Sequence, residues 1–472
     1  MSAMQTNNSS GRAAEIVRNS TVAEVVREGN CMGCGTCAAA CPAGALHIEL
    51  DSGRGIYRPV LDPAACTDCG LCLKVCPGRE VPIDGLADRF VDADHRHEKF
   101  GRYRELCWGY ACDEQIRFQG ASGGLITALL AHALETKRID GAVVLGHDPD
   151  SPLRTRPFVA RSREEIVAAS GSKYCPAAMN VVLREIRERP GAYAVVGLPC
   201  EIHALRKWQA LDPILRERVR YALGLFCANE NTYLGTEYFL WSHRIRPSAV
   251  RSIRYRAGGW PGEIEIRTDR QVRRFRRATS EPRASRRARL ASAFHYDFMI
   301  PRCLVCPDQT CELADVSFAD PHLPEMRAKY RDGVSWSVVR TSAGEELVRS
   351  ARDAGCIHVE AFSEEQAGRA QNYRYKAGVA GRMVLWKAKG HPVPAFGRNY
   401  PATPQMIRQA QSYRWTFHSH RRWIWPLLWL SCCCVRGPLA GMRRGMGALR
   451  RTIAKVLRWK KRDARPAEKE AQ

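Results

Sequence analysis

The sequence predicts two folded parts: a small α+β module near the N-terminal end of the 472-residue chain, followed by a larger α/β domain with a mostly parallel sheet. Two observations predict this order. A run of four cysteines recurs after 35 residues, inside residues 29–82. Between residues 105 and 390, short apolar segments alternate with helical ones, which is typical of βαβ units. A chain of this length can bury a separate core in each part.

Each cysteine run has the spacing C-x2-C-x2-C-x3-C and ends in a proline, Pro42 or Pro77. In such runs the first three thiolates ligate one [4Fe–4S] cube, and the fourth reaches across to the other cube. Residues 29–82 are therefore expected to form a ferredoxin-like domain with two [4Fe–4S] clusters. The first ligand set is Cys31, Cys34, Cys37 and Cys76, and the second is Cys66, Cys69, Cys72 and Cys41.

Two other uses of these cysteines are less favoured. Structural zinc sites usually take paired C-x2-C knuckles or mixtures of Cys and His, which the two complete four-cysteine runs do not resemble. Disulfides belong to oxidising compartments, and no secretory signal precedes the runs. Twenty cysteines without an export signal predict a chain that works in a reducing cytoplasm.

The segments around the runs are expected to be simple. Residues 1–28 begin polar and then form a short amphipathic helix over residues 12–28. Residues 47–60 alternate about a turn at Ser52-Gly53, which predicts a hairpin. Residues 81–105 are rich in charge and are expected to be a linker.

The net charge of +24 is concentrated in two stretches. Residues 267–289 hold ten arginines against two acids, and residues 391–472 hold seventeen Lys and Arg against three acids. The remainder of the chain is nearly neutral. Neither basic stretch shows an RNA- or DNA-binding module, so no nucleic-acid partner is expected.

The larger domain, expected over residues 105–390, reads as alternating strands and helices. Strands are expected over residues 106–111, 141–146, 193–197, 221–227 and 333–340, and the clearest helices over residues 125–134, 202–209 and 343–354. Cys200 and Cys227 lie at the carboxyl ends of two of these strands, where open α/β sheets bind ligands. Residues 252–256 and 263–268 predict a small antiparallel excursion.

Two local patterns indicate binding sites in this domain. Residues 120–124 are small and precede an apolar helix, so their N–H groups suit a phosphate, although an ordinary helix cap is the commoner reading. Cys303, Cys306 and Cys311 have a C-x2-C-x4-C spacing typical of metal ligands, and a zinc knuckle or buried thiols are the alternatives.

The tail over residues 391–472 is basic and contains an apolar, tryptophan-rich run at residues 423–435. Thirteen residues interrupted by Pro426 are too few to span a bilayer. Two readings stay open: an interfacial anchor on an anionic membrane surface, and a helix that packs back on the body.

Several segments together resemble the beta-subunit family of coenzyme F420 hydrogenases and dehydrogenases. They are residues 119–128, 171–174, 196–202, 223–227, 303–308 with 312–315, and 333–339. The resemblance implies a flavin, usually FAD, a third [4Fe–4S] cluster, and electron exchange with F420, ferredoxin or an organic substrate. It makes the larger part an α/β flavin-binding domain. Where many relatives have Gly-Asp, this chain has Ala319-Asp320.

Carried over by position, the resemblance implies the residues of both cofactor sites. The third cluster would be held by Cys200, Cys227, Cys303 and Cys306, whereas local spacing proposes Cys311 as the fourth ligand. Ser122, Gly123 and Gly124 would form the flavin-side loop, and Lys173 would stabilise an anionic reduced flavin or a phosphate.

The expected function is an iron–sulfur flavoprotein oxidoreductase that passes electrons between ferredoxin or F420-type carriers and a substrate. The alternative is an electron-transfer subunit of a larger complex with no substrate site of its own. The chain is expected in the cytoplasm, and the tail offers peripheral contact with the inner membrane face.

Overall fold

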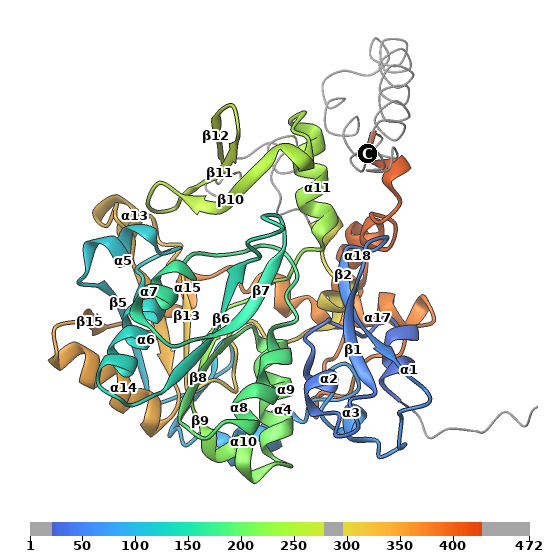
Figure 1. Ribbon diagram of the computed structural model, residues 1–472, viewed down its shortest axis with the longest axis horizontal. Coiled ribbons are helices and arrows are strands. Elements are labelled where there is room, and N and C mark those ends of the chain that lie inside the picture. The colour runs from blue at the N-terminus through green and yellow to red at the C-terminus, as the bar shows by residue number, and fades with distance from the viewer. Residues whose placement is uncertain (1–20, 278–295, 427–472) are drawn as a thin grey trace, which may run out of the picture.

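The computed structural model describes residues 21–277 and 296–426. The N-terminal module lies at one end of the molecule, drawn in blue in Figure 1, and the larger domain is built on a central sheet beside it. The predicted helix over residues 12–28 is described only from residue 21, where α1 (Val22–Arg27) is capped by the Thr21 side chain.

The N-terminal module is a compact pair of cysteine loops on a hairpin. β1 (Leu46–Asp51) and β2 (Ile56–Leu61) pair antiparallel, which confirms the predicted hairpin. Each cysteine run contains a short helix, α2 (Thr36–Ala40) in the first and α3 (Leu71–Lys74) in the second. Both helices start after a glycine in the left-handed region, Gly35 at φ 86° and Gly70 at φ 69°. Residues other than glycine are strained in this region.

The segment predicted as a linker, residues 81–105, is folded. It contains α4 (Ile83–Phe90), β3 (His95–His97) and β4 (Gly101–Tyr103). Val81, Ile83 and Leu86 are buried, so α4 is a helix with one apolar face packed on the body. Most of the charged residues of the segment follow α4, in and around β3 and β4, so the composition of the segment resembles that of a linker.

The central sheet has the strand order β15-β5-β14-β13-β9-β8-β6-β7. These strands are β5 (Glu105–Ala111), β6 (Gly141–His147), β7 (Thr155–Ala160), β8 (Tyr193–Gly197), β9 (Val219–Leu225), β13 (Val316–Ala319), β14 (Ser335–Val339) and β15 (Ile357–Ala361). β6, β8, β9 and β13 are parallel neighbours, but β7, β14 and β15 run against their neighbours. The mostly parallel sheet of the prediction is thus a mixed sheet with a parallel centre.

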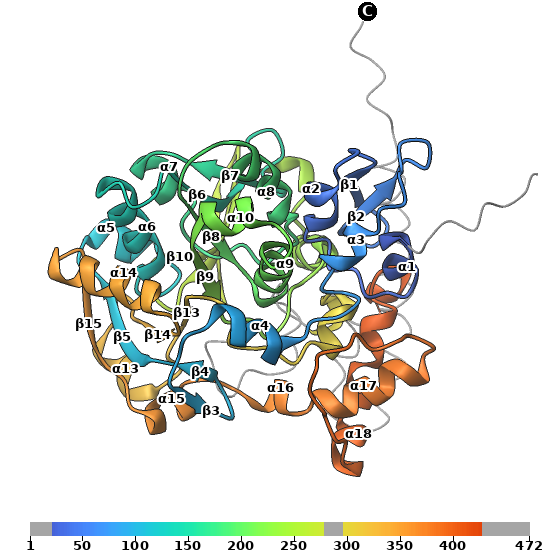
Figure 2. The ribbon, with the colours of Figure 1, turned by 90° about the horizontal axis from the view of Figure 1, so that it is seen from below.

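Helices cover both faces of this sheet, as Figures 1 and 2 show. Ala142 and Val144 pack with α6 (Leu125–Glu135) and α14 (Ser342–Asp353), whereas Val143 between them packs with helices of the opposite layer. The opposite layer holds α8 (Leu183–Glu188), α9 (Pro199–Gln209) and α10 (Pro213–Arg218). Alternate side chains of a strand point to opposite faces, so a strand buried on both sides is apolar throughout.

The smaller helices lie around this core. They are α5 (Glu114–Gln119), α7 (Arg163–Ala168), α11 (Tyr233–Ser242), α13 (Pro324–Lys329), α15 (Glu364–Ala370), α16 (Arg374–Ala377), α17 (Val379–Ala388) and α18 (Pro404–Ala410). The predicted antiparallel excursion is confirmed as three strands: β10 (Val250–Ala257), β11 (Glu263–Thr268) and β12 (Val272–Arg276). It projects above the central sheet beside α11 (Figure 1).

The chain continues to pack against the body beyond residue 390. Ala395 accepts a hydrogen bond from Val81 N–H at 2.6 Å, and the Asn30 amide donates to Pro392 O at 2.9 Å. Of the tryptophan-rich run, Trp425 is buried with Tyr238 and Phe298, while Trp423 is exposed. Ile424 is buried in the same cluster, and residues 427–435 of the run lie outside the described residues. Among the described helices, none combines the length and the apolar character needed to cross a bilayer.

Candidate metal centres and the adjoining sheet edge

The structure places the cysteines of each N-terminal ligand set in one region, although no group of three or more ligand side chains among the described residues is arranged closely enough to hold a metal ion. Cys41, Cys66, Cys69 and Cys72 line one cavity of the module, as the spacing predicts for the second cluster. Cys69 is exposed and the other three are half-buried. This candidate centre therefore lies near the molecular surface.

The first ligand set lies deeper. Cys31, Cys37 and Cys76 are buried, and the Cys37 thiol feels the charges of Cys34, Cys76 and Cys31. Burial raises the pKa of Cys31 and Cys76 to about 11 and that of Cys34 to about 12. Thiolates are the form that ligates metal, so binding here must release protons from thiols that are otherwise held neutral.

The third predicted set also converges. Cys200, Cys227, Cys303 and Cys306 line a single cavity. Cys200 lies in the first turn of α9, directly after β8, and Cys227 lies two residues beyond β9. Cys303 belongs to the 3-10 helix η5 (Pro301–Val305), and Cys306 follows it. Segments far apart in the sequence thus supply four thiols to one site at the carboxyl edge of the parallel strands.

Cys311 is placed differently. It is fully buried, has a positive φ of 56°, and is absent from the residues that line this cavity. A Cβ built on Gly224 of β9 would lie 2.5 Å from Cys311 Sγ, so this thiol packs directly against the backbone of the sheet. The geometry therefore groups Cys227, rather than Cys311, with the other three cysteines.

Four further residues at this cavity escaped the sequence analysis: Met32, Glu230, Arg302 and Lys376. Asp308 also lines it and lies in the segment 303–308, but no role for this carboxylate was expected from the sequence. Lys376 Nζ donates to Cys306 O at 3.0 Å, and Glu230 N–H lies 3.4 Å from Cys303 Sγ. Burial raises the pKa of Glu230 well above its usual range. Asp308 lies two residues after Cys306, so the cysteine motif points to it. No motif in the sequence around Lys376 indicates a role at this cavity.

The third cavity adjoins the first ligand set. Met32, which lines the cavity, is the neighbour of Cys31, and Arg302 Nη2 donates to Pro77 O at 3.3 Å. The Cys34 thiol feels the charge of Glu201, the residue that follows Cys200. The Cys31 set therefore adjoins the third cavity, and the charge of Cys72, from the second set, reaches the Cys37 thiol.

Polar contacts hold the module on the larger domain. Asn180 N–H donates to Cys34 O at 2.8 Å, and its side-chain amide donates to Thr36 Oγ1 at 2.8 Å. Arg184 donates to Ala38 O at 2.8 Å. Lys207 Nζ donates to Cys76 O at 2.8 Å. The groups that hold the first cysteine loop are thus supplied by the α/β domain.

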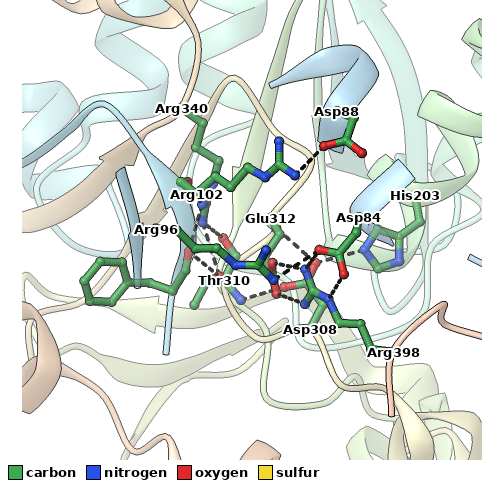
Figure 3. Close-up of polar contacts among 11 residues, drawn as sticks. Asp84, Asp88, Arg96, Arg102, His203, Asp308, Thr310, Glu312, Arg340 and Arg398 are labelled. Carbon is green, nitrogen blue, oxygen red and sulfur yellow. Dashed lines mark hydrogen bonds and ion pairs between the residues drawn. The ribbon is translucent and has the colours of Figure 1, made fainter. Parts of the chain in front are cut away.

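Figure 3 shows the polar network beneath the third cavity. Asp308 accepts hydrogen bonds from His203 Nε2 at 2.9 Å, Thr310 N–H at 2.9 Å and Glu312 N–H at 3.0 Å. Both partners of the His203–Asp308 pair are buried. Burial alone would raise the pKa of Asp308, but the His203 contact and the N–H groups hold it well below its usual range. This carboxylate therefore fixes the loop that carries Cys303 and Cys306.

The predicted flavin-side loop lies at the same edge of the sheet. Gly124 caps α6 with φ 75°, and Gly123 N–H donates to Ser335 Oγ at 2.9 Å. Ser122 Oγ is 2.6 Å from the same hydroxyl. The loop is therefore ordered by its own contacts to β14, and the Gly123 N–H is already paired.

Lys173 lies beside this loop but caps a helix. Its Nζ donates to the carbonyls of Ala169, Ser170 and Gly171 after α7. Burial lowers the pKa of Lys173 to about 8. Its charge also helps to lower the pKa of His147, at the end of β6, to about 4, after the larger effect of burial. The three donors of Lys173 are thus engaged, and a role toward a cofactor would act through its charge.

Asp320 forms a buried ion pair. It belongs to the Ala319-Asp320 pair, which stands where many relatives have Gly-Asp. Its carboxylate accepts from Arg256 at 2.6 and 3.1 Å and from Trp260 Nε1 at 2.9 Å. Burial would raise the pKa of Asp320, but Arg256 lowers it to about 2. The pair ties β10 to the end of β13, next to the loop of residues 258–262.

The cysteine sets in the N-terminal module and at the edge of the mixed α/β sheet have the ligand chemistry of iron–sulfur clusters. Comparison with protein families agrees. Residues 30–79 match the 4Fe-4S dicluster domain. Residues 106–184 and 191–365 match the N-terminal and C-terminal parts of the coenzyme F420 hydrogenase/dehydrogenase beta subunit. The chain belongs to that beta-subunit family.

Named relatives are similar at low identity. The coenzyme F420-dependent sulfite reductase of Methanocaldococcus jannaschii is 26% identical over 69% of this chain. The match covers 46% of the reductase, so this chain spans about half the length of that relative. The coenzyme F420 hydrogenase subunit beta of Methanosarcina barkeri is 27% identical over 57% of this chain and 85% of that subunit. Among solved structures, a chain of the F420-reducing [NiFe] hydrogenase complex from M. barkeri has 23% identity and a TM-score of 0.49. That likeness covers 65% of this chain and 99% of the other.

Proposed function

We propose that the protein is an iron–sulfur flavoprotein that exchanges electrons between an F420- or ferredoxin-type carrier and a second redox partner or substrate. One observation carries the proposal: four thiols from three separate segments line one cavity, next to the cysteines of the first ferredoxin ligand set. Bound [4Fe–4S] clusters would pass single electrons, and a bound flavin would exchange them in pairs.

The residues around the third cavity suit a negatively charged cluster. Lys376 and Arg302 bring positive charge to the cavity wall, and the N–H of Glu230 points at Cys303 Sγ. Nearby positive charge and hydrogen bonds to sulfur raise the reduction potential of a cluster. The domain would therefore hold the cluster between charges of both signs, because the Asp308 carboxylate lines the same cavity.

The edge beside the loop of residues 120–124 suits an anionic cofactor such as FAD. Lys173 supplies positive charge there, and a Cβ built on Gly171 would lie 3.7 Å from Gln119 O, so the two predicted segments lie side by side. His147 Nδ1 is buried there without a hydrogen-bond partner, as expected of a group that faces a ligand. The family membership supports the same assignment.

An electron-transfer subunit without its own substrate site is the second candidate. The observation that favours it is the surface position of the Cys41, Cys66, Cys69 and Cys72 cavity, where a partner protein can approach the clusters. Such a subunit would hold the clusters but no flavin.

Cofactor analysis separates the two candidates. Protein purified without oxygen is expected to contain about twelve iron atoms, since each cube holds about four, and about one flavin per chain. Twelve iron atoms without flavin would favour the electron-transfer subunit. A content of about eight iron atoms would show that the third cluster is absent, and would contradict electron transfer through it.

The tail gives a separate prediction. Ile424 and Trp425 are packed in the body, so a truncation that removes only residues 427–472 spares every described contact. We expect the truncated protein to lose binding to vesicles with anionic lipids, because the basic and aromatic residues of the tail suit an anionic interface. Sedimentation with vesicles measures this, and uncharged vesicles are the control. Equal binding by the truncated protein, or no binding by the full chain, would contradict a peripheral membrane contact.

A further inference from the structure

A pair of cysteines outside the cluster sets faces each other at the edge of the central sheet. β15 is the edge strand, and its register places Ile357 opposite Ala111 of β5. The next pair in that register is Cys356 and Cys112, and Cys112 N–H donates to Cys356 O at 3.0 Å. The two thiols are thus cross-strand neighbours.

This placement is close to what a disulfide needs. Directly opposed residues have Cβ atoms about 4.5–5.5 Å apart, and disulfides need about 3.5–4.5 Å. The hydrogen bond between Cys112 N–H and Cys356 O marks the wider kind of opposed pair, so closure requires a movement of about 1–2 Å at the end of an edge strand. Cys112 is exposed and Cys356 is half-buried, so an oxidant in solution can reach the pair.

A histidine stands beside the less exposed thiol. His132 of α6 has its Nδ1 3.6 Å from Cys356 Sγ and its Nε2 2.9 Å from Ser350 Oγ of α14. Burial lowers the pKa of His132, so the ring is neutral near pH 7. In the tautomer that donates its Nε2 proton to Ser350, Nδ1 lies toward Cys356 and can accept the thiol proton.

Cys356 needs such a base. Burial raises the pKa of Cys356, the charges of Glu135 and Cys112 raise it further, and Arg163 lowers it by a smaller effect. A thiol attacks sulfur only as the thiolate. Among the described residues, His132 supplies a ring nitrogen next to the Cys356 sulfur, where it can remove the thiol proton.

We propose that Cys112 and Cys356 form a reversible thiol–disulfide site served by His132, with low-molecular-weight disulfides such as oxidised glutathione as the oxidant. The exposed Cys112 thiolate attacks glutathione disulfide, forms a mixed disulfide and releases one glutathione. Cys356 gives its proton to His132 and attacks the Cys112 sulfur, which releases the second glutathione. Two protein thiols are oxidised by two electrons, and one glutathione disulfide is reduced to two thiols.

The site lies at the root of the loop of residues 120–124. Ala111, the neighbour of Cys112, donates its N–H to Gly123 O at 2.7 Å, and Asp113 on the other side caps α5. A bridge at Cys112 would therefore stiffen the strand end to which Gly123 of this loop is hydrogen-bonded.

Peptide mapping of the cluster-loaded protein tests the proposal. The protein is equilibrated without oxygen in glutathione buffers of rising oxidation, alkylated with iodoacetamide, and digested without reduction. We expect a Cys112–Cys356 cross-linked peptide whose fraction grows with the oxidised share of the buffer. Cys107→Ser, which changes a buried thiol of the same strand, should keep the cross-link. If both cysteines carry only separate glutathione adducts at the most oxidising ratio, the proposal is wrong.

The histidine is tested by rate. His132→Gln should slow cross-linking at pH 7 roughly tenfold or more, because a positioned base typically contributes at least that much. The final cross-linked fraction should be unchanged, and the rate deficit should shrink as the pH rises and the thiol loses its proton unaided. A variant that cross-links at the wild-type rate would remove His132 from the site. A deficit that stays constant with pH would show a merely structural role.

Discussion

Cys227→Ser is expected to remove about four iron atoms per chain, the content of one cube, whereas Cys311→Ser should leave the iron content unchanged. Cys227 lines the third cavity with Cys200, Cys303 and Cys306, so its loss leaves three ligands. Cys311 packs against Gly224 and reaches no cavity that holds the other cysteines. A serine there would cost some stability, because it buries a hydroxyl, but would keep the ligand set.

Iron determination and electron paramagnetic resonance of the reduced variants measure this difference. The spectra of the two ferredoxin-type clusters should persist in both variants, and they serve as internal controls. Cys227→Ala, which removes even a weak serine ligand, should match Cys227→Ser. The opposite pattern, with the third signal lost only in Cys311→Ser, would make the linear C-x2-C-x4-C motif the ligand set.

Asp308→Ala is expected to make the region of the third cavity less stable by about 3–5 kcal/mol, the usual effect of breaking a buried ion pair. The change leaves His203 without its partner and exposes the N–H groups of Thr310 and Glu312 to a cavity without acceptors. These contacts fix the loop that supplies Cys303 and Cys306 (Figure 3). Loss of the third cluster should therefore precede loss of the other two.

The half-life of cluster absorbance in guanidinium, measured without oxygen, reports this effect, because a cluster-loaded protein of several parts need not unfold reversibly. Asp269→Ala is the matched control, since its ion pair with Arg251 is exposed on both sides. That control should leave the half-life unchanged. Equal half-lives for Asp308→Ala and the native protein would show that the buried pair does not hold the cavity.

Much of the fold could be predicted because its signals are local. The cysteine spacing predicts which thiols of the N-terminal module gather, and Cys66, Cys69, Cys72 and Cys41 do line one cavity. Strand direction is different. β14 is buried at every residue, as a central parallel strand is, and nothing within Ser335–Val339 encodes that it runs against β13. A reading from local pattern therefore expects a more parallel sheet.

Other features depend on distant parts of the chain. β7 was missed because Pro157 and Arg156 weaken its strand pattern, and prolines are tolerated mainly in edge strands such as this one. Lys376 reaches the third cavity from α16, and only folding brings it to Cys306. Lys173 donates hydrogen bonds to three carbonyls, and the family resemblance of its motif does not predict these contacts.

The central claim is that electrons pass from the sheet-edge cofactor through the third cluster to the N-terminal clusters. Stopped-flow spectroscopy without oxygen, with reduced coenzyme F420 as the hydride donor, tests it most directly. In the native protein and in the control Cys107→Ser, flavin absorbance should change first and cluster absorbance should then bleach. In Cys303→Ser, the flavin step should proceed at the native rate while the N-terminal clusters stay oxidised. Bleaching of those clusters at the native rate in Cys303→Ser, or no reaction of the native protein with this donor, would contradict the account.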